Sequence, residues 1–145
     1  MYKKGEQSKE KLGVKILSFG ILTNKISEEI TDCISELRFK SPGILDIAVV
    51  SVEGLPIASL MLDNIDETRI SAMTAASLSL GERVVSELRK GKVMKILIEG
   101  DNGYIVTMQA GENAVITVST TPDTKLGLLF LDLERAAIKL GKLLT

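Results

Sequence analysis

Two hydrophobic periodicities alternate along the chain and predict eight elements. In three segments apolar residues recur every three or four positions, the spacing of one side of a helix: residues 24–40, 65–90 and 124–143. In five shorter segments β-branched residues dominate and turn residues flank the run: 44–50, 56–62, 93–99, 104–109 and 114–120. The predicted order is α-β-β-α-β-β-β-α. Strands joined by short hairpins favour an α+β fold with one five-stranded antiparallel sheet.

The connections between the strands have the composition of hairpin turns. Glu53-Gly54 and "GDNG" (100–103) lie between predicted strands and lack the glycine spacing of a P-loop or a dinucleotide-binding turn. The strands at 44–50 and 93–98 are apolar nearly throughout, which is typical of strands buried from both sides. We therefore expect turns rather than phosphate-binding loops, and helices on both faces of the sheet.

Capping residues place the helix ends. Thr23 or Asn24 can cap the first helix. Asn64 with Glu67 three residues later resembles a capping box for the long helix, and Gly91 stands where a C′ glycine closes one.

The amino-acid composition excludes several classes of function. The 145 residues fit one domain, and 45% hydrophobic with 26% charged residues is an ordinary composition for a globular protein. The net charge of −1 provides no electrostatic attraction for nucleic acid. Histidine is absent and Cys33 is the only cysteine, so neither a histidine-based triad nor a Cys/His metal cluster can form. Cys33 lies on the apolar side of its helix and is interpreted as a core residue. We expect a protein that is not an enzyme and needs no cofactor.

The first residues of the chain and the length of its apolar segments indicate where in the cell the protein is located. Residues 1–15 are rich in lysine and form either a solvated tail or an anion-binding arm. The run at 16–22 is short for a signal peptide, and no segment reaches the roughly 20 apolar residues of a membrane span. These features predict a cytoplasmic protein. Residues 11–22, "KLGVKILSFGIL", suit a helix or a strand almost equally.

Two charged clusters have competing interpretations. Asp63, Asp66 and Glu67 suit the capping of a helix better than a divalent-ion site, because their spacing does not match a calcium loop. Arginines on or beside the long helix are either solvated charges or a source of an arginine finger for another protein: Arg69, Arg83 and Arg89.

The long helix is unusually slender between residues 70 and 84. "ISAMTAASLSLGERV" carries seven Ala, Ser or Gly residues, and a glycine in a helix interior costs about 1 kcal/mol relative to alanine. Small residues allow a second backbone to approach closely. We expect one side of this helix to rest on its own sheet and another to meet a partner, with close packing inside the chain as the alternative.

The elements, taken in order, resemble the Roadblock (dynein light chain) family over residues 25–144. Four segments carry the resemblance: "GILDIAVVSVEGLPIAS", "AMTAASLSLGERVVSEL", "KILIEGDNGYIVTMQAGENAVITV" and "KLGLLFLDLERAAIKLGKLL". The resemblance implies a Roadblock-like domain at 24–145, with the long helix on one face of the sheet and the terminal helices on the other. Residues 1–23 are an extension that the common core lacks.

The resemblance also implies a function. Family members are usually homodimers in which the long helices lie side by side and the strands corresponding to 93–99 pair across the twofold axis. They scaffold or regulate small Ras-like GTPases, in bacterial and archaeal forms among others, or serve as dynein light chains. The implied dimer residues are Ile70, Met73, Ser77, Leu80, Gly81, Val84, Leu88, Val93, Lys95 and Leu97. The implied GTPase contacts are exposed residues of the long helix, Ser71, Thr74 and Glu82.

Three functions remain open from the sequence. The first is a GTPase-binding homodimer, whether it activates the GTPase, promotes exchange or tethers it. The second is a structural adaptor in a motor or signalling assembly, without effect on nucleotide state. The third is a small-molecule sensor, because an antiparallel sheet flanked by helices can enclose a ligand.

Overall fold

The computed structural model describes residues 13–17 and 24–145, and within these ranges the chain forms three helices and six strands. In chain order the elements are β1 (Lys15–Ile16), α2 (Asn24–Lys40), β2 (Ile44–Ser51), β3 (Pro56–Leu60), α3 (Glu67–Glu87), β4 (Ile96–Gly100), β5 (Gly103–Ala110), β6 (Ala114–Thr120) and α4 (Leu126–Leu143). The eight predicted elements are all present, and β1 is additional.

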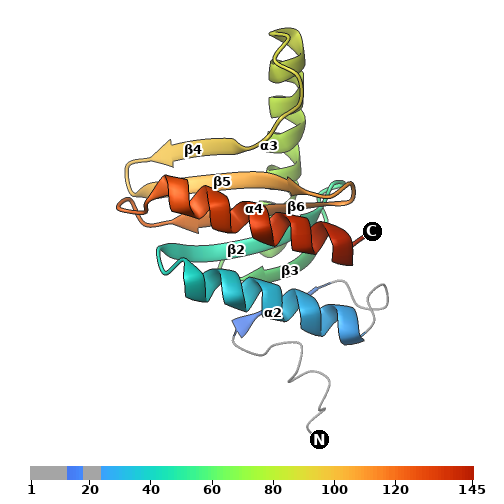
Figure 1. Cartoon of the computed structure of the whole chain (residues 1–145), viewed down its shortest axis with the longest axis vertical. Coiled ribbons are helices and arrows are strands. Elements are labelled where there is room, and N and C mark those ends of the chain that lie inside the picture. The colour runs from blue at the N-terminus through green and yellow to red at the C-terminus, as the bar shows by residue number, and fades with distance from the viewer. Residues whose placement is uncertain (1–12, 18–23) are drawn as a thin grey trace, which may run out of the picture.

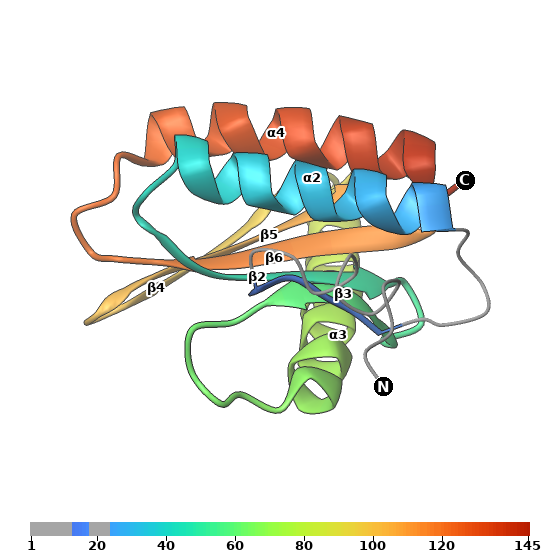
Figure 2. The same ribbon diagram turned by 90° about the horizontal axis from the view of Figure 1, so that it is seen from below.

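The strands form one antiparallel sheet in the order β1-β3-β2-β6-β5-β4. Helices α2 and α4 lie side by side on one face, and α3 lies on the other (Figure 2). Figure 1 shows α3 crossing the strands and extending past β4, the edge strand. The α+β prediction with helices on both faces is confirmed, and the sheet has six strands instead of five.

The sixth strand comes from the N-terminal extension. Lys15 pairs with Ser59 of β3, and the Leu17 amide donates to the Ile57 carbonyl at 2.7 Å. Val14 and Ile16 are buried while Lys15 is exposed, the alternation of a half-buried strand. The sequence left helix and strand open here, and the structure selects strand for residues 15–16. Residues 1–12 and 18–23, with most of the lysine-rich start, lie outside the described part.

The hydrophobic core lies between the sheet and the α2–α4 layer. Ile30 and Ile34 of α2 and Leu133 of α4 pack on the central strands, which contribute Ile47 and Ile116. Ala48 and Val50, which alternate with Ile47 and Val49 and lie on the α3 face, are buried as well, so the prediction that this strand is buried from both sides is confirmed. The same prediction for 93–98 is wrong in the single chain, because β4 begins only at Ile96 and lies at the sheet edge.

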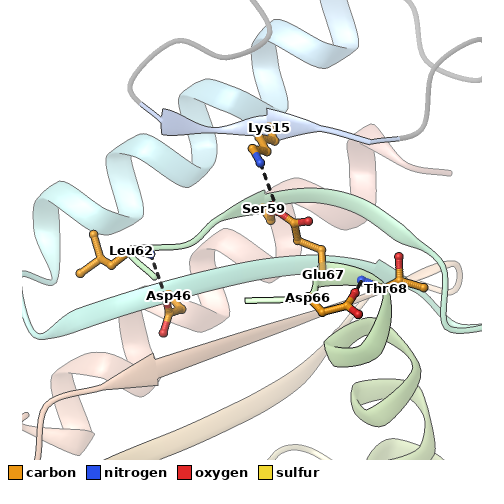
Figure 3. Close-up of polar contacts among 7 residues, drawn as sticks. All are labelled: Lys15, Asp46, Ser59, Leu62, Asp66, Glu67 and Thr68. Carbon is orange, nitrogen blue, oxygen red and sulfur yellow. Dashed lines mark hydrogen bonds and ion pairs between the residues drawn. The ribbon is translucent and has the colours of Figure 1, made fainter. Parts of the chain in front are cut away.

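The N-terminal cap of α3 differs from the predicted one. Asp66 precedes the helix, and its Oδ1 accepts from the amide of Thr68 at 3.0 Å (Figure 3). It also accepts from the amide of Arg69 at 3.2 Å. The predicted cap Asn64 lies outside the helix, which begins at Glu67 rather than at residue 65. The interpretation of the acidic cluster as a cap is thus confirmed for Asp66.

The C-terminal end of α3 also differs. The helix ends at Glu87, and the predicted C′ glycine, Gly91, has a φ of 88° but lies beyond the cap. The C′ position belongs to Arg89, which takes the left-handed conformation with a φ of 56°. Its amide donates to the Ser86 carbonyl at 3.1 Å, and the Lys90 amide donates to the Val85 carbonyl at 2.8 Å. This is the Schellman arrangement, with an arginine at the position where glycine is usual.

Candidate interaction surface

The inner side of α3 is built from small and polar residues. Ser71, Thr74 and Leu78 share one side of the helix and are buried against the sheet. The Ser71 hydroxyl donates to the Glu67 carbonyl at 2.6 Å within the same helix. The prediction that Ser71 and Thr74 are exposed GTPase contacts is therefore wrong, because the helix rests on this side. Glu82 is exposed, as predicted.

Several of the small residues make room inside the chain. A β-carbon built on Gly54, in the β2–β3 turn, would lie 3.4 Å from Ala75 Cβ and 3.5 Å from Ala72 Cα. Gly54 has a φ of 96°, so the hairpin interpretation of this turn is confirmed. On the same helix Gly81 faces Ile96 of β4. Gly81 therefore packs on the chain's own strand, and its place in an intermolecular seam stays a prediction.

A row of large apolar residues lies on one flank of α3, next to the contact between Gly81 and Ile96. Met73, Leu80, Val84 and Leu88 are 57%, 65%, 49% and 66% exposed. Ile70 and Ser77 are partly exposed and continue the row at helical spacing. We call these six residues the α3 stripe. The sequence assigned all six to a dimer interface, and the structure brings them together on one accessible side of the helix.

The open edge of the sheet continues this surface. Among the described strands β4 pairs only with β5, so its outer edge carries free backbone groups. Ile98 of β4 is 47% exposed and lies opposite Ile105 of β5, which is 43% exposed. The sequence placed strand 93–98, which contains Ile98, beside the dimer seam without naming this residue, and it missed Ile105. Strand alternation from Ile96 would have placed both on the α3 face.

Three further predicted dimer residues lie around β4. Leu97 is 44% exposed, and strand alternation places it on the face opposite Ile96 and Ile98. The Lys95 ammonium lies 4.8 Å from the centre of the Phe130 ring on α4, so this side chain points to the α4 side instead of joining the stripe. Val93 is partly exposed and lies against Gly81.

The charged groups of this region have structural partners or are solvated. The Glu67 carboxylate lies 3.6 Å from the Lys15 ammonium, and the Ser59 hydroxyl donates to it at 3.4 Å (Figure 3). Residues 13–17 and 24–145 contain no group of three His, Cys, Asp or Glu able to hold a metal ion. Arg69, Arg83 and Arg89 are all exposed.

Cys33 lies in the core between α2 and α4. Its thiol is 3.9 Å from the Ala136 carbonyl oxygen, and the residue is buried. Burial raises the pKa of the thiol to about 11; nearby Lys139 opposes this shift and Glu36 adds to it. The interpretation of Cys33 as a core residue is confirmed.

The fold and the exposed stripe define the class, a small antiparallel α+β domain with an apolar helix flank open to solvent. Residues 31–120 match the Roadblock/LC7 domain, and the chain belongs to this family. The uncharacterized protein MJ0310 of Methanocaldococcus jannaschii is 34% identical over 101 residues, which cover 70% of this chain and 88% of that protein.

Solved structures share the fold. The gliding protein MglB of Thermus thermophilus superposes with a TM-score of 0.75 at 15% identity, over 88% of this chain and 93% of that one. A further MglB structure, described as having a tetrameric arrangement, gives 0.76 at 16% identity over the same shares. Within the described residues of the present chain, none of the helices has the length and apolar content of a membrane span.

Proposed function

We propose that the chain forms a homodimer through the α3 stripe and the β4 edge, and that the paired helices bind a small Ras-like GTPase. The observation that carries the proposal is the continuity of the two surfaces. Leu80 and Val84 of the stripe line one hollow with Ile96 and Ile98 of β4, next to a strand edge with free backbone groups. A second copy of the chain covers the α3 stripe and the β4 edge at once. This contact removes apolar surface from water and pairs the open strand edge.

The symmetry of such a dimer follows from the position of β4. If two β4 strands pair antiparallel about a twofold axis perpendicular to the sheet, the two α3 helices lie antiparallel on the same face. The part of α3 that extends past β4 in Figure 1 then lies over the partner's sheet. In this arrangement the apolar stripe of each helix faces the other helix.

The outward side of the paired helices is the proposed GTPase surface. Ala72, Ala76 and Ser79 are exposed on the side of α3 that points away from the sheet. Glu82 is exposed too, but it follows the buried Leu78 by four residues and so lies on the sheet-facing side of the part of α3 that extends past β4. The short side chains of Ala72, Ala76 and Ser79 leave a flat strip that a globular partner can approach closely. The family resemblance supports a GTPase as that partner, and this strip takes the place of the buried Ser71 and Thr74.

Light scattering at micromolar concentration tests the dimer. We expect the mass of two chains for the wild type and the mass of one chain for Leu80→Glu, which places a charge in the stripe. Leu128→Glu is the matched control, because Leu128 is 62% exposed on α4, far from the stripe in the fold. A monomeric wild type, or a dimer that survives Leu80→Glu, would contradict the proposed interface.

The GTPase is tested by co-purification and by nucleotide hydrolysis with a small Ras-like GTPase from the same genome. We expect complex formation with the wild type and its loss with Ala76→Arg, while light scattering still reports a dimer. A changed hydrolysis or exchange rate in the complex identifies a regulator, and unchanged rates identify an adaptor. Failure of every small Ras-like GTPase of the genome to bind would overturn this part of the proposal.

A further inference from the structure

The side chains at the open edge of β4 are arranged almost symmetrically about Leu97. On the α3 face Ile96 and Ile98 flank it, and on the α4 face Lys95 and Glu99 flank it at a distance of two residues. Leu97 and Ile98 are 44% and 47% exposed, and Lys95 and Glu99 are exposed as well. The edge therefore has an apolar centre, with a basic residue before it and an acidic residue after it.

A second copy can meet this edge in only a few registers. In the proposed homodimer the twofold axis is perpendicular to the sheet, so every side chain stays on its own face. Residues that pair across the axis must then share a face, and this places the axis at a residue instead of between two residues. The possible centres are the residues of β4, 96–100.

Side-chain chemistry favours the register that is centred on Leu97. Lys95 of one copy then faces Glu99 of the second copy, and this pair occurs twice in the dimer. Ile96 faces Ile98 and the two Leu97 side chains meet, so that apolar groups face apolar groups. A centre at Ile98 sets Leu97 against a carboxylate, and a centre at Ile96 sets it against an ammonium group. A centre further along the strand brings carboxylates of the two copies together.

The position of α3 selects the same register. The helix crosses the strands (Figure 1), and it passes β4 where Gly81 lies against Ile96. With Leu97 on the axis, the two Ile96 residues and the helices above them are separated by about 7 Å along the strands. This is close to the distance of about 8 Å at which helices with small residues pack. A centre at Ile96 would superpose the helices, and one at Ile98 would separate them by about 14 Å.

A hollow beside α3 lies where this register places the second helix. Leu80 and Val84 line the hollow together with Ile98. In the register centred on Leu97, Ile98 faces Ile96 of the second copy, and the α3 helix of that copy lies against this Ile96. The second helix therefore covers the hollow and the exposed side chains of Leu80 and Val84.

From these observations we infer that two copies pair through β4 with Leu97 on the twofold axis, and that Lys95 and Glu99 select the partner. This inference rests on the proposed homodimer and adds the register of the strands and the residues that set it. Shifted registers are disfavoured because they bring like charges together or set a charge against Leu97. The partner that fits this edge carries the same pattern in the opposite direction, which a second copy of the chain does.

Single cysteines in the full-length chain test the register. All these variants also carry Cys33→Ala, which removes the native thiol. At the axis, equivalent residues of two antiparallel strands lie roughly 4.5 to 5.5 Å apart, within the range that a disulfide bridges. We expect Leu97→Cys to give a disulfide-linked dimer on a non-reducing gel after treatment with oxidised glutathione. Ile98→Cys is the matched control, because its two copies would lie about 8 Å apart and stay unlinked.

Charge exchange tests the pair itself, with the dimer dissociation constant measured by analytical ultracentrifugation. We expect Lys95→Glu and Glu99→Lys each to raise the constant about tenfold, because two opposite pairs become like-charged in each dimer. The constant of the chain that carries both changes returns to within about threefold of the wild type. Lys95→Glu with Asp101→Lys is the matched control and shows no recovery, because Asp101 faces Lys95 only in the register centred on Ile98. Circular dichroism checks that each variant is folded.

The outcomes separate the register from the dimer. A wild-type dimer in which Ile98→Cys links and Leu97→Cys does not would overturn the register and leave the dimer standing. Recovery with Asp101→Lys instead of Glu99→Lys has the same meaning. A wild-type dimer in which neither cysteine links overturns pairing through β4, and with it the inference. A wild type that stays monomeric overturns both the homodimer and the register.

Discussion

Gly81 on α3 and Ile96 on β4 approach so closely that a β-carbon at position 81 would lie 3.0 Å from Ile96 Cδ1. The slender helix therefore has a cause inside the chain. Glycine at this position lets the helix pass the edge strand before it extends beyond the sheet (Figure 1). Leu80 and Val84, on the neighbouring flank, line a hollow with Ile96 and Ile98 and stay largely exposed.

We predict that Gly81→Leu lowers the free energy of unfolding by about 1–3 kcal/mol, because the larger side chain overpacks the contact with Ile96. Gly81→Ala is the matched control. Alanine gains about 1 kcal/mol in helix propensity over glycine, and this gain offsets the cost of its close contact with the movable end of the Ile96 side chain. The free energy of unfolding of Gly81→Ala should therefore stay near that of the wild type. Urea denaturation measures both, and additivity of Gly81→Leu with Ile96→Ala in a double-mutant cycle would show that the two residues do not compete for space.

At Arg89 we predict a substitution that stabilises the fold. A non-glycine residue in the left-handed conformation costs about 1–2 kcal/mol, so Arg89→Gly should raise the free energy of unfolding by about 1 kcal/mol. Arg89→Ala removes the same charge but keeps the strain, and it should give no such gain. Thermal and urea unfolding at one fixed protein concentration compare the variants. Equal stability of the glycine and alanine variants would contradict the strain at this position.

The elements were predictable because each has its own periodicity. Residues 24–40 repeat apolar positions at helical spacing, and α2 occupies this range. The strands at 104–109 and 114–120 were placed within one or two residues of β5 and β6, because glycine and asparagine fix their turns. Local signals of this kind do not depend on what packs against the element.

The faces of α3 were harder to predict, because its buried side is not its most apolar side. Ser71 and Thr74 face the sheet, whereas Met73 and Leu80 face solvent. The polar character of Ser71 and Thr74 therefore led to the wrong prediction that they are exposed, whereas Met73 and Leu80 were placed on an outer side of the helix. The strand at 15–16 depends on its pairing with β3, a long-range contact that no local pattern encodes.

Cys33 gives a pH-dependent prediction. Because burial raises the pKa of its thiol from 9.0 to about 11, the folded chain retains this proton over a range in which the unfolded chain has lost it. The free energy of unfolding should therefore fall as the pH rises from about 9 to 11, and less so in Cys33→Ala. Urea denaturation at the two pH values measures the difference between the proteins. Parallel losses in both would contradict the buried, protonated thiol.

The last prediction concerns the N-terminal extension, which the sequence separated from the domain at residue 24. Ile16 is buried in the core cluster and belongs to the strand that covers the β3 edge. We predict that Ile16→Ala lowers the free energy of unfolding by about 2–5 kcal/mol, the usual cost of removing a large buried side chain. Lys15→Ala, at the adjacent exposed position, should cost less than about 1 kcal/mol, because it removes only a surface ion pair with Glu67. Equal effects of the two changes in urea denaturation would mean that residues 14–16 add nothing to the core. The expected difference instead makes this segment part of the folding unit, so that a chain beginning at residue 24 would be less stable than the full chain.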